Sequence, residues 1–386
     1  MEMILALLMM VWGNASAADP GLTLDRLVQA AEAAPAIAQA DGSADPLKPL
    51  IKSDPQKDAP KVKGVYATAH SAGGARLDTL LKLLDETELN SLVVDIKDDW
   101  GNLTYDMGSD KLNELGTTQR IIRDMPALME KLKEHDVYPI ARIVVFKDTM
   151  LAKKRPDLSF LNPDGTLWGN GKNPPDSFVN PYQKEVWEYN VEVAKEAVKA
   201  GFKEIQFDYV RFPEGFENRA DILKYEKDER SRIDAVAGFI KYAREQLSPL
   251  GVRVSVDIFG YAASVPAAEG IGQDFQKISQ NVDVICPMIY PSHYSTGWFG
   301  AKVPDAAPYQ TISGASVDTH KKLEPLAELK PVVRPWIQDF TATWVPGHIK
   351  YGKQQLDDQI RALKDNGIDE YLLWNAANTY TPGVQY

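Results

Sequence analysis

The chain of 386 residues has a single cysteine, Cys286. It can therefore form no disulfide within itself, no cysteine-based zinc site and no redox pair. Cys286 lies in an apolar run (282–291), so we expect a buried structural thiol. The five histidines show neither HxH nor HExxH spacing, which argues against a histidine-based metal site. We predict no metal site and no cofactor.

Basic residues are in the minority and do not cluster. There are 43 Lys and Arg against 54 Asp and Glu, which gives a formal charge of −11. Because nucleic-acid binding needs a basic surface that displaces counterions, we expect no nucleic-acid partner. The sequence also has no glycine-rich phosphate loop after its first predicted strand and no GxSxG motif, which argues against a dinucleotide-binding fold and a serine hydrolase.

The first hydrophobic run is short. Residues 4–11 (ILALLMMV) fall well below the roughly 20 residues that a membrane span needs, and small residues follow at 15–17. We predict a signal peptide at 1–17, a secreted, periplasmic or cell-surface location, and no membrane span in the mature chain. Residues 18–61 are rich in Ala, Asp and Pro and predict a linker.

From residue 62 onward, short β-branched runs alternate with long amphipathic stretches. The predicted strands are 62–68, 91–97, 137–146, 204–212, 252–260, 282–291, 330–338 and 369–375. Helical patterns lie between them at 76–89, 125–136, 185–201, 235–251 and 355–367. Strict alternation implies a parallel sheet, and eight such units in 62–386 predict an α/β fold of the (β/α)8 TIM-barrel type.

Two aspartates are the strongest catalytic candidates. In a (β/α)8 barrel the chemistry lies at the carboxyl ends of the strands. Period-two alternation turns Asp208 of the fourth strand and Asp257 of the fifth strand toward the barrel interior. Neighbouring strands lie about 4.8 Å apart, which is close to the roughly 5 Å separation of the carboxyl groups in retaining glycosidases. We therefore predict a carboxylate pair.

The two carboxyl groups need different roles. We predict Asp208 as nucleophile or charge stabiliser and Asp257 as the acid/base, with Glu214 as a rival acid. Arg211 can fork onto a carboxylate and keep it ionised. The alternative for Asp208 is a structural ion pair with Arg142 or Arg211, and Asp257 also has a structural alternative.

Other polar and aromatic residues near the strand ends are candidates for substrate binding. They are Asp95, Lys97, Trp100, Arg142, Gln206, Arg211, Tyr290, His293, Trp336, Gln338, Trp374 and Asn375. Six tryptophans at strand ends or in the following loops favour a cleft that binds the flat faces of sugar rings. They are Trp100, Trp168, Trp298, Trp336, Trp344 and Trp374. The segment 147–180 is long enough for a lid, and a plain surface loop is the alternative.

Eight segments carry most of these candidates. They are KGVYATAHSAG, SLVVDIKDDWGNLTYD, ARIVVFKD, FVNPYQKEVWEYN, EIQFDYVRFPEG, VSVDIFGY, ICPMIYPSHY and YLLWNAANTY. The set resembles the bacterial putative glycoside hydrolase domain of exported envelope proteins over about residues 62–380, and FDYVRFP is its most specific part. The resemblance implies a barrel, glycan hydrolysis and Asp208 at the nucleophile position. The fourth strand lacks the DxxDxDxE run of chitinase-type barrels, so substrate-assisted cleavage is not implied.

The sequence thus predicts an exported glycoside hydrolase that acts on an envelope or extracellular polysaccharide. A glycan-binding barrel without catalysis is one alternative, since it would keep the aromatic cleft. A cation-dependent hydrolase or lyase that uses Asp95, Asp98 and Asp99 is another, although 97–102 (KDDWGN) is also typical of a solvated turn.

Overall fold

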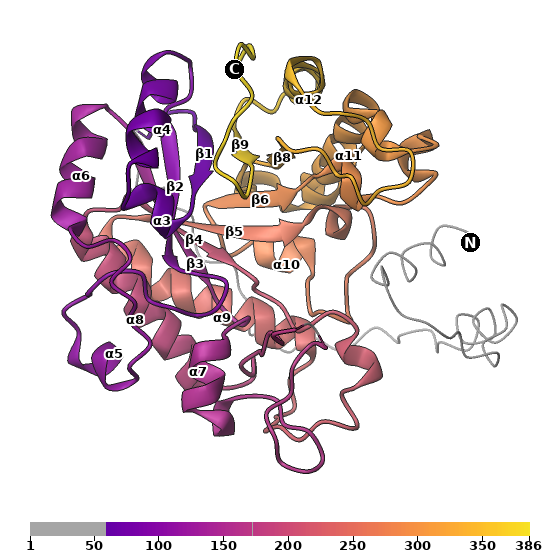
Figure 1. The fold of residues 1–386 in the computed structure, drawn as a ribbon. Coiled ribbons are helices and arrows are strands. Elements are labelled where there is room, and N and C mark those ends of the chain that lie inside the picture. The colour runs from indigo at the N-terminus through magenta and orange to yellow at the C-terminus, as the bar shows by residue number, and fades with distance from the viewer. Residues whose placement is uncertain (1–58, 172) are drawn as a thin grey trace, which may run out of the picture. The chain divides into compact units, whose positions relative to one another are not determined.

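A computed structural model describes residues 59–171 and 173–386. The predicted signal peptide and residues 18–58 of the predicted linker lie outside the described residues. The described strands form one closed barrel in the order β5-β4-β3-β2-β1-β9-β8-β6-β7, and β5 pairs with β6 to close it. All the strand pairs are parallel. The predicted (β/α)8 barrel is confirmed (Figure 1).

The strands follow the predicted apolar runs closely. They are β1 Lys63–Ala67, β2 Ser91–Lys97, β3 Tyr138–Val144, β4 Glu204–Asp208, β5 Arg253–Phe259, β6 Val284–Met288, β7 Val332–Val333, β8 Trp336–Gln338 and β9 Tyr371–Trp374. The predicted strand 330–338 is interrupted between β7 and β8, where Pro335 has no N–H to donate to the ladder. Because β7 and β8 share one position, the nine strands form an eight-position barrel.

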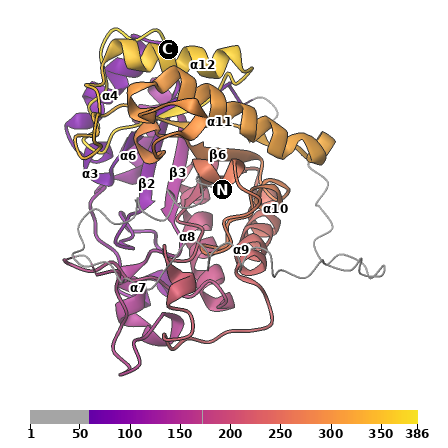
Figure 2. The ribbon, with the colours of Figure 1, turned by 90° about the vertical axis from the view of Figure 1, so that its right-hand side faces the viewer.

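Helices lie outside the strands (Figures 1 and 2). They are α3 Ala69–Ala72, α4 Arg76–Asp85, α5 Asp110–Glu114, α6 Met125–Glu134, α7 Thr149–Lys154, α8 Lys184–Ala200, α9 Arg232–Leu247, α10 Phe275–Ser279, α11 Pro308–Leu323 and α12 Lys353–Asp365. The five predicted helical patterns correspond to α4, α6, α8, α9 and α12. In the part of the chain that the structure describes, no helix has the length and apolarity to cross a membrane.

Side chains fill the barrel interior in the way that the alternation predicts. On β4, Phe207 points outward and its ring contacts that of Phe239 on α9 at 5.3 Å. Gln206 points inward, where its Nε2 lies 3.4 Å from the sulfur of Cys286. Cys286 is fully buried in the interior cluster, as expected for a structural thiol. The same alternation sets the direction of Asp208, two residues after Gln206.

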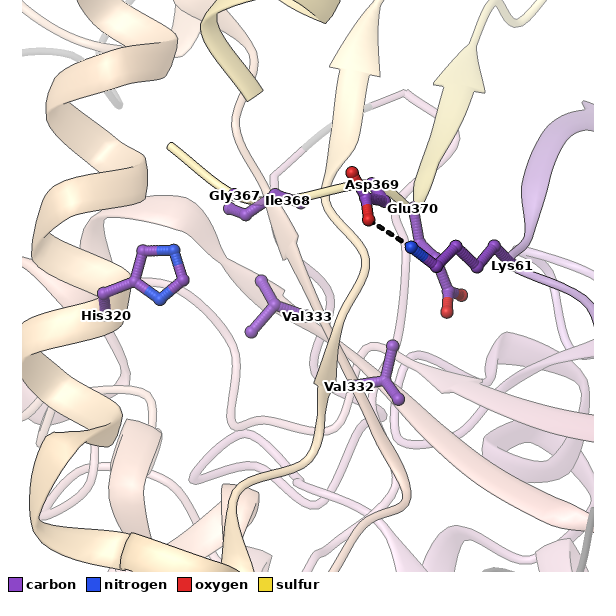
Figure 3. Close-up of a pocket in the computed structure, with 8 residues that line it drawn as sticks. All are labelled: Lys61, His320, Val332, Val333, Gly367, Ile368, Asp369 and Glu370. Carbon is purple, nitrogen blue, oxygen red and sulfur yellow. Dashed lines mark hydrogen bonds and ion pairs between the residues drawn. The ribbon is translucent and has the colours of Figure 1, made fainter. Parts of the chain in front are cut away.

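The amino-terminal end of the barrel is closed by a buried arginine. Arg334 donates from Nη1 to Glu204 at 2.7 Å and from Nε to Glu370 at 2.9 Å, and both Arg334 and Glu204 are fully buried. A pocket of about 220 Å³ lies beside them, where Lys61 pairs with Asp369 (Figure 3). This end is opposite the carboxyl ends of the strands, so we interpret it as a stabilising element of the barrel.

Replacing Arg334 by methionine removes the cation that compensates the buried Glu204. We expect Arg334→Met to lower the free energy of unfolding by about 3–5 kcal/mol, because a buried carboxylate without a partner is costly. Denaturant unfolding measures this loss. Lys131→Ala, which breaks the exposed ion pair with Asp78, is the control and should change the midpoint little. Equal effects of the two variants would contradict the assignment.

Candidate functional site

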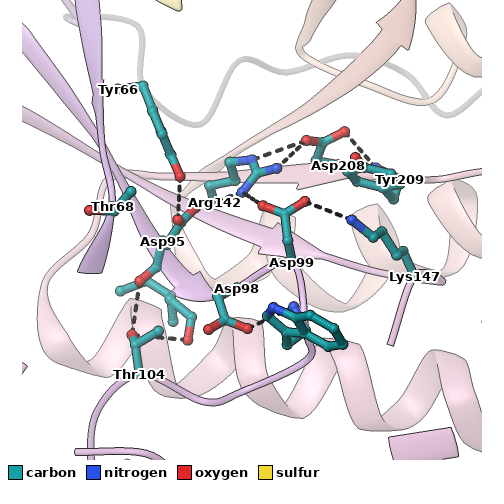
Figure 4. Close-up of polar contacts among 12 residues, drawn as sticks. Tyr66, Thr68, Asp95, Asp98, Asp99, Thr104, Arg142, Lys147, Asp208 and Tyr209 are labelled. Carbon is teal, nitrogen blue, oxygen red and sulfur yellow. Dashed lines mark hydrogen bonds and ion pairs between the residues drawn. The ribbon is translucent and has the colours of Figure 1, made fainter. Parts of the chain in front are cut away.

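One guanidinium group organises the carboxyl ends of β2, β3 and β4. Arg142 is 1% exposed and donates to Asp95 at 2.6 Å and to one oxygen of Asp208 at 3.0 and 2.6 Å. Asp99 accepts a longer bond of 3.4 Å from the same guanidinium (Figure 4). The strand register explains the meeting, because Asp95 lies opposite Arg142 and Arg142 lies opposite Gln206. The site thus has three carboxyl groups around one buried cation.

Asp208 is held on both of its oxygens. Oδ2 accepts the two bonds from Arg142, and Oδ1 accepts the backbone N–H of Tyr209 at 2.6 Å. Tyr209 has a positive φ of 51°, which ends β4 and is strained backbone for a residue with a large side chain. The sequence leaves Arg142 and Arg211 open as ion-pair partners of Asp208, and in the structure the partner is Arg142. These donors hold the side chain of Asp208 in one orientation.

Asp257 lies at the height of Asp208 on the neighbouring strand. The register pairs Gln206 with Ser255 and Phe207 with Val256, so the next residues along the two strands are the two aspartates. Asp257 is buried and accepts a hydrogen bond of 2.7 Å from the indole N–H of Trp336. Burial, followed by the negative charge of Asp208, raises the pKa of Asp257 well above its usual value. The two carboxyl groups therefore have opposite electrostatic surroundings.

Asp95 is the third buried carboxyl group of the site. Its Oδ2 accepts a hydrogen bond of 2.5 Å from the hydroxyl of Tyr66, and its Oδ1 faces Arg142. Burial raises the pKa of Asp95 to about 6, although Arg142 acts in the opposite direction. Sequence reasoning did not single out Tyr66, whose only signal is its position near the carboxyl end of the first predicted strand.

Asp99 is the more accessible carboxyl group of the cluster, with a side chain that is 38% exposed. Lys147 lies 3.5 Å from Asp99 and 3.6 Å from Asp176. Burial alone would raise the pKa of Asp99, but Arg142 and Lys147 together hold it below its usual value. Lys147 was not predicted as a site residue, because nothing in the sequence shows that the loop after β3 returns over the loop after β2.

The aspartates after β2 do not have the arrangement of a cation site. Asp98 accepts the backbone N–H groups of Trp100 and Asn102, each at 2.9 Å, and so closes the predicted turn. Arg142 already occupies the space between Asp95 and Asp99. Over the ranges 59–171 and 173–386, no three His, Cys, Asp or Glu side chains are grouped as a metal site would require. The geometry therefore does not fit the cation-dependent alternative.

Arg211 does contact a carboxylate, but it is the carboxylate of Glu214, with a distance of 3.0 Å. The guanidinium also lies over the rings of Phe259 and Tyr209, at 4.7 and 4.9 Å from the ring centres. Arg211 is buried, whereas the side chain of Glu214 is 43% exposed. Glu214 is therefore the most exposed of the three predicted catalytic carboxyl groups.

The sequence predicts Lys97 as a substrate-binding residue, but its side chain does not lie in the site. The register shifts between Asp95 and Lys97, and this irregularity reverses the face on which Lys97 lies. Its ammonium group is fully buried at 2.6 Å from Asp148 and 2.9 Å from Asn190 of α8. Lys97 therefore joins β2 to the outer helices, and we expect no contact between Lys97 and a substrate.

Two further predicted residues stabilise loops. Gln338 is fully buried, donates to Asp305 at 2.9 Å and accepts the backbone N–H of Ser292 at 3.0 Å. Asn375 donates from Nδ2 to the backbone carbonyl groups of Asp339 and Thr379, at 2.5 and 2.7 Å. Both residues hold the loops at the mouth together, so any effect they have on a substrate passes through those loops.

Aromatic residues line the β1 and β9 side of the site. The half-buried Trp374 stacks on Tyr66, with 4.2 Å between ring centres, and lies 5.5 Å from the guanidinium of Arg142. Tyr290 contacts His293, which is exposed at the rim. Trp336 is buried against Trp374 and Asp257.

The tryptophans predicted for the cleft divide into two groups. Trp168, Trp298 and Trp336 are buried and pack as core residues. Trp374 is half-buried, and Trp100 and Trp344 are exposed by 37% and 65%. Only this second group offers ring surface to a ligand.

The segment 147–180 is packed around its own aromatic core. Trp168 contacts Phe160 and Phe178, each at 6.5 Å between ring centres. Lys147 forms an isolated bridge with Phe178, which returns the segment to its starting point. Lys147 and Asp176 bring the segment to the edge of the site, so it contributes residues there.

One family model matches most of the chain. A family model described as "putative glycosyl hydrolase domain" matches residues 64–380. A solved hypothetical protein from Ruminiclostridium thermocellum shares 34% identity, over 50% of this chain and 97% of that one, with a TM-score of 0.46. No curated protein matches the chain in sequence.

Two solved glycoside hydrolases share the fold at low identity. The glycoside hydrolase domain of PgaB (BpsB) from Bordetella bronchiseptica is 13% identical, with 82% of this chain and 95% of that chain covered and a TM-score of 0.53. The α-galactosidase TtGalA from Thermus thermophilus, solved with stachyose, is 13% identical, with coverages of 84% and 63% and a TM-score of 0.52.

The raised pKa of Asp95 predicts a pH-dependent stability. A carboxyl group with a pKa of about 6 in the folded chain and 3.8 in the unfolded chain binds its proton more tightly when folded. Its stabilising contribution is complete below pH 4 and is lost as the pH rises through 6. The free energy of unfolding of the wild type, relative to Asp95→Asn, should therefore fall by roughly 3 kcal/mol between pH 4 and 7. A pH-independent difference in denaturant unfolding would contradict this.

Proposed function

We propose that this chain, which belongs to the putative glycosyl hydrolase domain family and so to the glycoside hydrolases, cleaves the O-glycosidic bonds of a bacterial envelope or extracellular polysaccharide. Asp208 and Asp257 are its carboxyl pair. One observation carries the proposal: two inward carboxyl groups stand at equal height on neighbouring strands, in opposite electrostatic surroundings. Two carboxyl groups of one site with different protonation states are what glycoside hydrolysis requires.

The first step needs an ionised nucleophile. In this step Asp208 acts as the carboxylate, with Arg142 and the backbone N–H of Tyr209 as its hydrogen-bond donors. One oxygen of Asp208 bonds to the anomeric carbon as the bond from that carbon to the leaving oxygen breaks. Asp257, whose burial favours its neutral form, gives its proton to the leaving oxygen. Arg142 also stays in place to orient Asp208 as charge moves off the carboxylate.

The second step releases the sugar. Asp257 is now ionised and takes a proton from water, and the water oxygen bonds to the anomeric carbon while the bond to Asp208 breaks. With that proton Asp257 is neutral again, and Asp208 is again a carboxylate, so both groups regain their starting forms. The spacing of neighbouring strands, about 4.8 Å, favours this retaining route over the inverting route, which needs carboxyl groups further apart.

Glu214 remains the rival acid. Its side chain is 43% exposed at the mouth, so a glycosidic oxygen can reach it more easily than it can reach the buried Asp257. Its carboxylate already accepts a hydrogen bond from Arg211, however, whereas a general acid must donate a proton to the leaving oxygen. Asp257 therefore fits the role of general acid better because burial favours its neutral form, whereas Glu214 fits it better because its side chain is exposed.

Several of the aromatic and polar residues are suited to hold the sugar. Trp374, which stacks on the buried Tyr66, offers a flat apolar face beside Arg142, and Trp100 and His293 are exposed at the rim. Aromatic faces with nearby polar groups suit a carbohydrate ligand. The exported location rests on the sequence of residues 1–17 and forms part of the same proposal.

A glycan-binding barrel without catalysis is the second candidate. It is favoured by one observation, namely that both oxygens of Asp208 are already engaged, by Arg142 and by the backbone of Tyr209. A carboxylate with so many partners also suits a purely structural role. Substitution of Asp208 separates the two functions.

Asp208→Asn should abolish turnover. Asparagine keeps the shape of the side chain but cannot attack the anomeric carbon, so we expect release of reducing ends from the cleaved polysaccharide to fall roughly 10³-fold or more. The assay compares the chain from Ala18 with the variant on a panel of bacterial exopolysaccharides, peptidoglycan and plant and storage glycans. Asp221→Asn, in an exposed loop, is the matched control. Undiminished turnover would rule out Asp208 as the nucleophile.

Leaving-group dependence identifies the acid. We expect Asp257→Asn to lower turnover of the polysaccharide by about 10²–10⁴-fold, because the leaving oxygen is no longer protonated. The kcat/KM for a nitrophenyl glycoside of the same sugar should fall much less, since nitrophenolate leaves without a proton and kcat/KM reports only the steps up to its departure. Glu214→Gln is the comparison and should affect both substrates alike. If Glu214→Gln shows the selective loss instead, Glu214 is the acid.

A further inference from the structure

A second hollow lies on the same face of the barrel as the carboxyl pair. It has a volume of about 310 Å³ and lies where β8 and β9 end, and its walls include Asp339, Phe340, Tyr351, Asn375 and Tyr380. We call it the β8–β9 pocket. A hollow of this size is within the range of small-ligand sites. Neither Asp208 nor Asp257 lines it, so it is separate from the reacting centre.

The rim of the pocket carries an exposed aromatic pair. Trp344 stacks nearly parallel on Phe340, with 5.9 Å between ring centres and an angle of 20° between planes. Trp344 is 65% exposed, the highest value among the exposed large apolar side chains of the described residues. An indole held flat against a pocket wall and open to solvent on its other face suits the apolar face of a sugar ring.

The pocket is connected to the reacting centre by aromatic contacts. The ring of Phe340 meets that of Tyr290 at 6.1 Å. Tyr290 belongs to the interior cluster that also contains Trp336, and the indole N–H of Trp336 donates to Asp257 at 2.7 Å. An aromatic path therefore leads from Trp344 on the surface to the proposed acid. Tyr290 and Trp336 are buried, so these contacts fix the pocket next to the reacting centre, on the face of the barrel that a bound glycan chain would cross.

The polar groups of the pocket are held in place by hydrogen bonds within the chain. Asp339 accepts two bonds from Thr381, at 2.9 and 2.6 Å, and its backbone carbonyl accepts one from Asn375 at 2.5 Å. Tyr351 donates to the backbone of Asp305 at 3.0 Å. A site whose walls are already bonded to one another loses little conformational entropy when it binds.

We infer that the β8–β9 pocket and Trp344 form a remote subsite for a further sugar of the glycan chain that is cleaved at Asp208. The inference rests on the proposed function and deepens it. The substrate class is an oligosaccharide or polysaccharide long enough to reach both places, so the chain length of the substrate decides how tightly it binds.

Removal of the exposed indole tests the subsite. We expect Trp344→Ala to raise the KM for the cleaved polysaccharide about tenfold and to leave its kcat unchanged, because the indole binds substrate and transition state alike. The nitrophenyl glycoside of the same sugar, which is too short to reach Trp344, should keep its KM. Leu250→Ala, an exposed apolar residue in the turn before β5 and so at the amino-terminal end of the barrel, is the matched control. An unchanged KM for the polysaccharide in Trp344→Ala would overturn the subsite.

Binding without turnover separates this inference from the proposed function. In native gels cast with soluble glucans, mannans, galactans and amino-sugar polymers, the wild type and Asp208→Asn should be retarded alike, and Trp344→Ala should be retarded less. That pattern supports the subsite even if Asp208→Asn leaves turnover unchanged and the catalytic assignment fails. The subsite would be overturned if Trp344→Ala and the wild type were retarded equally, or if no polymer retarded the wild type. Neither result would change the conclusion drawn from the turnover assay.

Discussion

The ion pair between Arg142 and Asp208 is the interaction on which the site depends. A guanidinium that is 1% exposed is costly to bury, and it is compensated here by carboxylates from β2, from the loop after β2 and from β4. The same contacts orient Asp208. Asp257, on the neighbouring strand, lies beside the negative charge of Asp208, which raises the pKa of Asp257. The compensation of the buried Arg142 and the orientation of the proposed nucleophile therefore come from one arrangement of charge.

The two ends of the barrel use buried arginines for different purposes. At the amino-terminal end, Arg334 pairs with Glu204 and Glu370, and the network supports the closed sheet. At the carboxyl end, Arg142 faces more carboxyl groups than it can neutralise. The excess negative charge there raises the pKa of Asp257, after the larger effect of burial. This separation lets the mouth carry strained and charged groups while the other end stabilises the fold.

The aromatic residues extend the proposed site beyond Asp208 and Asp257. Buried tryptophans such as Trp336 shape the interior and donate to Asp257, whereas the half-buried Trp374 and the exposed Trp344 present ring faces. Their order around the mouth, from β9 to the loop after β8, follows the strand order of the closed sheet. The proposed ligand, a chain of sugars, suits such a spread of surfaces, because separate ring faces can contact separate units.

The sequence by itself determined the barrel, the burial of Cys286 and the inward direction of Asp208 and Asp257, because strand alternation is a local property. Tertiary structure decided the rest of the candidate site. It turned Lys97 away through a register shift, joined Asp208 to Arg142 and Arg211 to Glu214, and buried half of the predicted aromatic cleft. Periodicity tells which face a residue occupies, but the partner of a charge depends on loops and strands that are distant in the chain and meet only when the sheet closes.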